Sequence, residues 1–298
     1  MGRFLDWWFA PAQPERLRLF EKAFALTFVL YMGAWLHGAR EWLTTDGFHY
    51  PLALSDLAFS MPLPPLPPWA LWPFVAVLLG APLLVVFGRW RRPALLVTLL
   101  CAFYVQRVDT YSAFTINKLY LVGFLVLLLA PTPRPVTLAD DSTGLRQSSW
   151  PLRVLQGTLI IQYGTAGICK VAHGDWLQRF DILLGHSVGL YRTEAAGWLV
   201  GVLPTWAWVV QGVLALGFEL FAPVLFTVRR LRPVAYVIGC GMHAVIALMM
   251  VDLIWFSLQM VTFYLLFVDG DRMARAARWL GEPLTTGPIS GSEPSPDR

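Results

Sequence analysis

Long apolar runs separated by short polar loops dominate the sequence. Eight of these runs come near the length that an α-helix needs to cross about 30 Å of hydrocarbon. Only Asp252 separates the last two runs, which predicts either a tight hairpin or one broken helix. The pattern predicts an all-α polytopic membrane protein with about eight transmembrane helices, at residues 20–39, 69–88, 93–108, 115–130, 152–172, 205–228, 233–251 and 253–268.

Basic residues are distributed unevenly between alternate loops. Of the 23 Lys and Arg residues, all but six fall in or beside the loops on one side of the predicted membrane. The other side holds only Arg40, Arg107, Lys118, Lys170, Arg179 and Arg192. Cytoplasmic loops of membrane proteins carry the excess of Lys and Arg. The sequence therefore predicts that both termini are cytoplasmic, which agrees with an even number of spans.

The same pattern divides the chain into three parts. Residues 1–19 mix aromatic and charged side chains and are predicted to lie along the membrane interface. Residues 20–269 form the transmembrane domain, with outer cap loops at 40–68 and 173–204. The second of these loops should contain short amphipathic helices. Residues 270–298 are predicted to be a cytoplasmic tail that is partly disordered.

Composition narrows the class of protein. Hydrophobic residues make up 56% of the chain, charged residues 14%, and the mean hydropathy is +0.56. Soluble domains carry about 25% charged residues, so soluble enzymes, disordered proteins and nucleic-acid binders are disfavoured. The net charge of +4 follows from membrane topology and needs no acidic partner. The three cysteines are scattered and no metal-binding pattern occurs, so no metal is expected.

Two ionisable residues fall in the middle of predicted spans, where such groups are costly. Glu219 lies ten residues before Arg229, and His243 lies ten residues after Pro233. At 1.5 Å per residue, both are about 15 Å from the inner surface. Because their helices are consecutive and antiparallel, we expect the two side chains to meet within hydrogen-bond reach, either directly or through one water. Such a pair could pin two helices together, or it could handle protons or contact a ligand.

A second polar cluster ends the segment at 152–172. It extends from Gln162 to Trp176, and Lys170 and His173 share one helix face. Lys170 is predicted about two residues inside the outer boundary, where it could simply extend its amine towards water. Alternatively, partial burial could favour a neutral amine that acts as a base. The outer-side charges that could face it are Arg107, Asp109, Lys118, Asp175 and Asp252.

These residues resemble a known family. The run YGTAGICKVAHGDW, from Tyr163 to Trp176, is similar to a Tyr-x-x-Ala-Gly-x-x-Lys-Leu-x-x-x-Trp signature. That signature belongs to the HTTM family, the membrane domain shared with vitamin K-dependent γ-glutamyl carboxylase. The stretch FELFAPVLFTVRRLRPVAYVIGCGMHAVIALMM also resembles the family, with Glu219 and His243 at the matching positions.

The resemblance implies a quinone-dependent reaction at a site open to the outer side. In the carboxylase, a reduced quinone is oxygenated to a strong base that removes a γ-proton from glutamate, and the quinone leaves as its epoxide. The lysine that deprotonates the hydroquinone matches Lys170. The predicted catalytic residues are therefore Lys170, His173 and Asp175. The predicted cofactor-binding residues are Glu219, His243, Trp176 and Gln162, with a quinone or hydroquinone as the cofactor and no metal.

The expected function is that of a quinone- or lipid-utilising membrane enzyme acting at the outer face, on a peptide as one candidate substrate. The alternative is a non-catalytic membrane subunit that binds lipid or quinone, or an accessory factor for peptide maturation or export. Short bacterial members of the family resemble the membrane component of a peptide-maturation system that works beside a small partner protein. The expected partners are thus membrane lipids, a small protein and a peptide. The expected location is the bacterial inner membrane.

Overall fold

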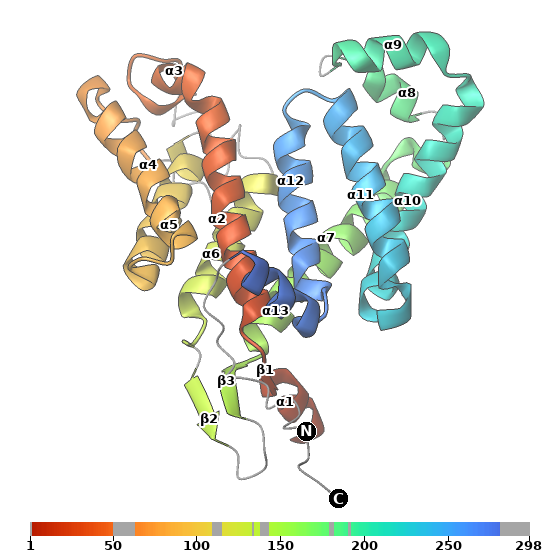
Figure 1. Cartoon of the computed structure of the whole chain (residues 1–298). Coiled ribbons are helices and arrows are strands. Elements are labelled where there is room, and N and C mark those ends of the chain that lie inside the picture. The colour runs from red at the N-terminus through yellow and green to blue at the C-terminus, as the bar shows by residue number, and fades with distance from the viewer. Residues whose placement is uncertain are drawn as a thin grey trace, which may run out of the picture.

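The computed structural model of the chain describes residues 2–49, 63–108, 115–132, 134–137, 143–178, 182–189 and 192–280. It is a bundle of long helices with short helices at both ends (Figure 1). The predictions for Asp109, for residues 50–62 of the first cap loop and for the disordered tail at 281–298 lie outside the described residues.

Each of the eight predicted apolar segments forms a helix within a few residues of its expected bounds. The largest difference is at the first segment, where helix α2 begins five residues earlier than the apolar run. The eight helices are α2 (Glu15–Trp35), α4 (Leu71–Val86), α5 (Arg91–Val108), α6 (Thr115–Leu129), α7 (Trp150–His173), α10 (Thr205–Thr227), α11 (Arg232–Met249) and α12 (Leu253–Tyr264).

Four described helices are long and apolar enough to cross a membrane, and a fifth qualifies if one bent helix pair is a single span. The four are the segments that contain α2, α4 and α10, and the segment Arg229–Met249, which contains α11. The bent pair joins α12 and its 3-10 extension η6 (Leu265–Phe267) to α13 (Gly270–Trp279), with a 115° angle between them. The remaining predicted spans correspond to α5, α6 and α7, which do not meet these criteria together; α6 is apolar but has only 15 residues. The protein is therefore a polytopic helical membrane protein, with four to five spans established by length and composition.

The loops gather at two opposite ends of the bundle. One end, the cap end, carries α3 (Ala39–Leu43), α8 (Ile182–Ser187) and α9 (Glu194–Val202) (Figure 1). The other, the basic end, carries α1 (Gly2–Phe9), α13 and a small sheet. The helical pieces expected within residues 173–204 are thus present as α8 and α9. The tight turn expected at Asp252 is also present, because this residue adopts the left-handed conformation (φ 64°) between α11 and α12.

The small sheet at the basic end was not predicted from the sequence. Its strands are β1 (Pro11–Ala12), β2 (Arg134–Thr137) and β3 (Thr143–Ser148), in the antiparallel order β1-β3-β2. Its strands are too short to give a periodic signal. The Ser149 hydroxyl donates to the Trp8 carbonyl (3.0 Å), so the sheet region also ties the N-terminal segment to the start of α7.

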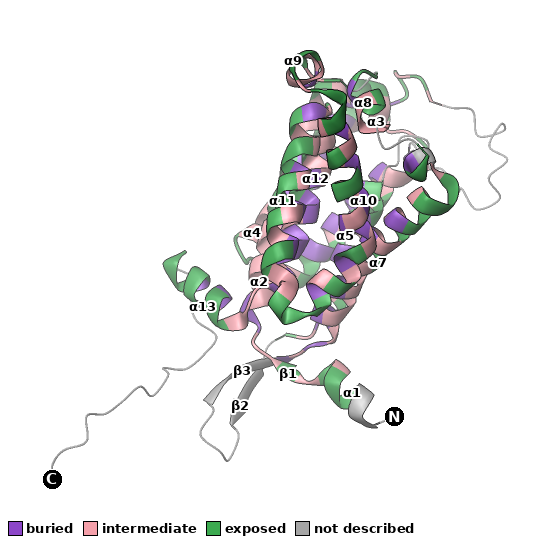
Figure 2. Cartoon of the chain, turned by 90° about the vertical axis from the view of Figure 1, so that its right-hand side faces the viewer, coloured by how far each residue is buried: buried purple, intermediate pink, exposed green. Residues whose placement is uncertain are grey.

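Buried aromatic rings hold the bundle together, while apolar side chains also cover its outside. Phe24 contacts Phe20, Phe124 and Phe263 at ring separations of 5.0–5.5 Å, which joins α2 to α6 and α12. The outward faces of the long helices are exposed (Figure 2) and carry large apolar residues such as Leu100. Continuous apolar surface of this extent fits contact with lipid rather than water.

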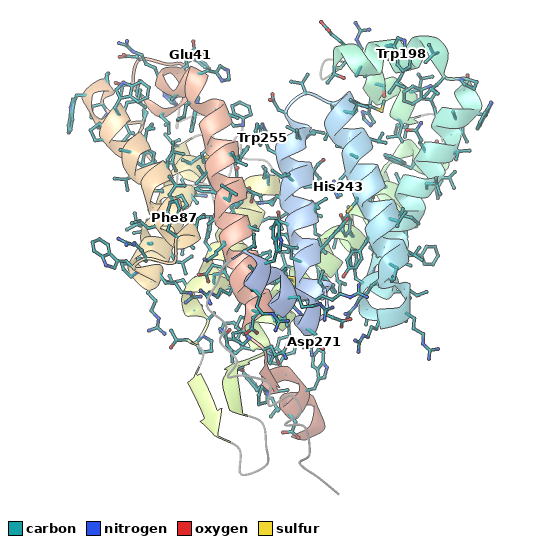
Figure 3. The ribbon with its side chains drawn as sticks, viewed as in Figure 1. Glu41, Phe87, Trp198, His243, Trp255 and Asp271 are labelled. Atoms are coloured by element: carbon teal, nitrogen blue, oxygen red, sulfur yellow. The ribbon has the colours of Figure 1, made fainter. Side chains whose placement is uncertain are left out.

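Exposed tryptophans mark two levels on this surface. Trp69 and Trp72 start the helical segment that leaves the cap end, and Trp198 lies on α9 at that end (Figure 3). Trp90 lies in the turn between α4 and α5, and Trp279 ends α13 at the basic end. Tryptophan is enriched at both membrane–water interfaces. The bundle axis between these two levels is therefore the direction that crosses the membrane.

Candidate active site at the contact of α7 with α10

Helices α7 and α10 make an unusually close antiparallel contact through glycine. A side chain built on Gly167 would lie 3.0 Å from the Leu220 nitrogen and 3.1 Å from the Glu219 carbonyl carbon. One turn earlier, Gly164 lies opposite Pro223. Small residues let helix backbones approach in this way. The contact brings Glu219 of α10 alongside the last turns of α7.

At this contact, Lys170 and Glu219 form an ion pair inside the helical bundle. The Lys170 Nζ donates to Glu219 Oε1 at 2.5 Å. The lysine side chain is 28% exposed and the glutamate side chain only 11%. The ammonium also lies 4.5 Å from the ring centre of Trp176, which is buried beyond the end of α7. The second carboxylate oxygen, Glu219 Oε2, is buried and has no hydrogen-bond partner among the described residues.

The pair is deeper than the sequence suggested for Lys170. Because Gly167 lies against Glu219 and Leu220, the Lys170 backbone is level with about Gly217. That level is about 18 Å from the first residue of α10 at 1.5 Å per residue. The end of the apolar run at Ala172 therefore does not mark the cap end of the bundle. Helix α7 ends at His173, inside the bundle, and the residues that follow it continue towards the cap end.

A second polar cluster lies on the same face of α7, two turns before Lys170. The Tyr163 hydroxyl is 2.6 Å from His243 Nε2 on α11 and 2.6 Å from the Tyr264 hydroxyl on α12. All three side chains are buried, and Phe218 and Phe226 pack against the Tyr163 ring. His243, labelled in Figure 3, faces the interior of the bundle, and its Nδ1 has no hydrogen-bond partner among the described groups.

Glu219 and His243 do not form the direct hydrogen bond that was one form of the predicted pairing, and contact through one water stays a prediction. Both residues are buried and both have polar neighbours, but Glu219 bonds to Lys170 and His243 bonds to Tyr163. Asp252, the one expected outer-side carboxylate whose side chain is described, is also not the partner of Lys170. The physical reason is the register of α7, which brings Lys170 down to the level of Glu219 and places Tyr163 beside His243.

The sequence pattern of the HTTM domain matches residues 9–271. The chain belongs to the HTTM family. The matched region contains all four helices of the site, and the HTTM domain is a membrane domain, which together with the apolar helices makes this an integral membrane protein. The chain matches no curated protein and no solved structure.

Within the HTTM domain, the structure brings together three of the predicted site residues, Lys170, Glu219 and Trp176. His243 lies in the neighbouring cluster. His173 is exposed at the last residue of α7, and the side chain of Asp175 lies outside the described part of the chain. Gln162 is half-buried and forms no hydrogen bond to the ion pair within the described residues. The roles of all seven residues remain predictions.

Two residues of the HTTM site were not selected from the sequence, Tyr163 and Tyr264. Tyr163 opens the signature-like run and precedes Lys170 by seven residues, which places both on one helix face. That spacing could have identified it. Tyr264 has no such signal, because only the packing of α12 against α7 and α11 brings its hydroxyl to Tyr163.

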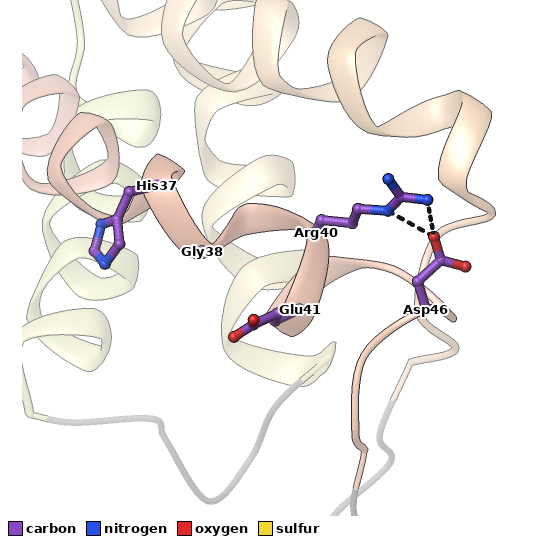
Figure 4. A pocket seen from close by; sticks show the side chains of 5 residues that line it. All are labelled: His37, Gly38, Arg40, Glu41 and Asp46. Carbon is purple, nitrogen blue, oxygen red and sulfur yellow. Dashed lines mark hydrogen bonds and ion pairs between the residues drawn. The ribbon is translucent and has the colours of Figure 1, made fainter.

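A separate hollow opens at the cap end of the HTTM domain, lined by His37, Gly38, Arg40, Glu41 and Asp46 (Figure 4). It contains the exposed ion pair between Arg40 and Asp46 at 2.7 Å. It lies beside α3, whereas His243 lies on α11 (Figure 3). Among the described residues, no group of three or more His, Cys, Asp or Glu side chains could hold a metal ion.

Proposed function

We propose that this protein is a membrane enzyme that uses a hydroquinone, with the Lys170–Glu219 pair as the group that accepts the proton. The observation that carries the proposal is an ion pair within the bundle whose second carboxylate oxygen has no partner. Ionisable groups at such depth are by default candidates for function, and an unsatisfied buried oxygen requires an explanation.

The pair as a whole, rather than Lys170 alone, is the base. Its two members share one proton, which gives either an ammonium beside a carboxylate or an amine beside a carboxylic acid. Both arrangements are neutral overall, which limits the cost of burial. Each can accept one further proton, and both then become an ammonium beside a carboxylic acid. Glu219 is therefore an acceptor for the substrate proton and does not merely orient the lysine.

The residues around the pair fit a hydroquinone. A hydroquinone hydroxyl is both a donor and an acceptor, and Glu219 Oε2 is a buried acceptor without a partner. Ile168 on α7 and Phe221 on α10 flank the contact and are 61% and 62% exposed on the outside of the bundle. This apolar flank suits a lipid-like tail. When bound, the hydroquinone would supply, on oxygenation, the strong base that abstracts a proton from a further substrate, for which a peptide is our candidate.

The second candidate function is a non-catalytic subunit that binds lipid or quinone. One observation favours it: Lys170 and Glu219 neutralise each other and hold α7 against α10, which a purely structural pair would also do. In that case a small partner protein would supply the chemistry.

Turnover of a tailed hydroquinone separates the two functions. We expect the purified protein in lipid nanodiscs to bind phylloquinol, with quenching of the fluorescence of Trp176. In air, it should convert phylloquinol to the epoxide faster than the Lys170→Arg variant does. Binding with equal turnover in both proteins would favour the non-catalytic subunit. Failure to bind phylloquinol would contradict the hydroquinone-using enzyme and the quinone-binding subunit, and would favour a subunit that binds lipid.

We further propose that all eight long helices cross the membrane, with both termini in the cytoplasm. Successive helices turn at alternate ends of the bundle, and the exposed arginines of the loops gather at the basic end. The pair would then be reached from the outer half of the membrane.

Labelling with a membrane-impermeant maleimide tests this orientation. In a variant without native cysteines, a cysteine at Gly189 of the cap should react in intact cells. A cysteine at Arg230, in the turn η5 (Arg229–Leu231), should react only after permeabilisation. The reverse pattern would place the cap, and with it the approach to Lys170, on the cytoplasmic side.

A further inference from the structure

Helix α13 leaves the bundle sideways at the basic end. It makes a 115° angle with the α12–η6 segment, and it projects from the base of the bundle (Figure 2). Met273 and Ala277 are buried where α13 packs against α2. Its orientation is thus that of a helix lying along the membrane surface rather than across it. Most of it, residues 272–279, lies beyond the region that matches the HTTM domain.

The outward face of α13 combines arginine with tryptophan. Arg272, Arg275 and Arg278 are exposed and have no ion-pair partner within the described residues. At 3.6 residues per turn they fall within an arc of about 120°, with Trp279 inside that arc. Trp279 is 87% exposed. Asp271, the acidic residue at the start of this helix, is exposed within the same arc, so the face carries three arginines against one aspartate.

The acidic residue that precedes α13 already has a basic partner. Asp269, just before α13, is already paired with Arg229 at 2.8 Å. The hydrogen bond from Arg229, with smaller contributions from Arg16 and Arg272, holds the pKa of Asp269 below its usual range. This carboxylate is therefore ionised and occupied by Arg229, so the arginine face of α13 keeps a net positive charge, with three arginines against Asp271.

We infer that the arginine face of α13 binds the headgroups of anionic phospholipids, with Trp279 inserted at the interface beside them. Guanidinium groups match phosphate geometry through paired hydrogen bonds. Tryptophan is the aromatic residue most suited to the headgroup level. A soluble protein partner would not account for the exposed Trp279. A membrane surface would, because it presents charged headgroups to the arginines and an apolar layer beneath them to the tryptophan. The inference is independent of the Lys170 site.

Thermal unfolding of the full-length protein in neutral detergent tests the inference. Titration with phosphatidylglycerol should raise the unfolding midpoint, whereas phosphatidylcholine should not. Each basic residue near an anionic surface contributes about fivefold in affinity, so R272Q/R275Q/R278Q should shift the titration by roughly 100-fold at low salt. The effect should weaken as the salt concentration rises.

Matched variants distinguish a specific role of the α13 arginines from a general effect of positive charge at this end of the bundle. R89Q/R92Q removes two exposed arginines from the same end of the bundle and should titrate like the unmodified protein. R272K/R275K/R278K keeps the charge and should retain most of the response, even if the glutamine variant is less stable. Three results would overturn the inference: an unchanged titration in R272Q/R275Q/R278Q, an equal response to phosphatidylcholine, or the same stabilisation by inorganic phosphate alone.

Discussion

Replacing Lys170 with methionine should abolish turnover and also lower the stability of the protein. Methionine has a similar length but accepts no proton, and it leaves the Glu219 carboxylate without its partner. Breaking a buried ion pair from one side costs about 3–5 kcal/mol, and the lower end applies here because Lys170 is 28% exposed. A lysine that only extended its amine towards water would contribute little to stability. The contact of Lys170 with Glu219 is what makes its loss costly.

Two further variants separate stability from proton transfer. Lys170→Met combined with Glu219→Gln removes both charges, so most of the stability should return while turnover remains absent. Lys170→Arg keeps the ion pair, but the guanidinium does not release its proton and can occupy both carboxylate oxygens. It should therefore be stable and inactive. Phylloquinol turnover and the unfolding midpoint in detergent measure both effects. Full turnover in Lys170→Arg or in the double variant would reject the pair as the proton acceptor.

Replacing Gly239 with alanine should destabilise the protein by about 2–4 kcal/mol, through overpacking and the loss of a buried hydrogen bond. A side chain at Gly239 would overlap the Tyr264 hydroxyl and would lie 2.8 Å from the Phe218 ring. The Tyr264 ring would have to move, which breaks its contact with Tyr163. The midpoint of unfolding in detergent should fall by several degrees.

Gly241 provides the matched control, two residues further along the same helix. A side chain built there meets no atom within 4 Å. Alanine is a better helix former than glycine, so Gly241→Ala should be neutral or stabilising by up to about 1 kcal/mol. Equal effects at the two positions would show that Tyr264 is free to move aside, and that the tyrosine–histidine cluster is not rigid.

The positions of the helices were predictable because apolar periodicity is a local property. The turns at Asp252 and near Arg91 follow from the polar residues that interrupt the apolar runs. The small sheet could not be predicted from the sequence, because a two-residue strand such as Pro11–Ala12 forms only when β3 lies beside it.

Three ionisable residues at the candidate site could be selected from the sequence, but their pairing could not. Lys170, Glu219 and His243 stand out because ionisable groups in apolar helices are rare. Which of them meet depends on the axial register of α7 against α10. Gly167 sets that register through a contact between the two backbones. No periodicity encodes that distance. The number of spans is likewise uncertain from the sequence, because α6 and α12 are shorter than a full crossing.

The early end of α7 has an electrical consequence. The ion pair lies about 18 Å below the start of α10, which is roughly half of the way through the hydrocarbon layer. A proton that leaves the pair for the outer water would cross about half of the membrane field, equivalent to about 1 kcal/mol per 100 mV. With a potential that is negative inside, this step is uphill. The proposed reaction would therefore be electrogenic, and its rate in energised membranes would depend on the membrane potential.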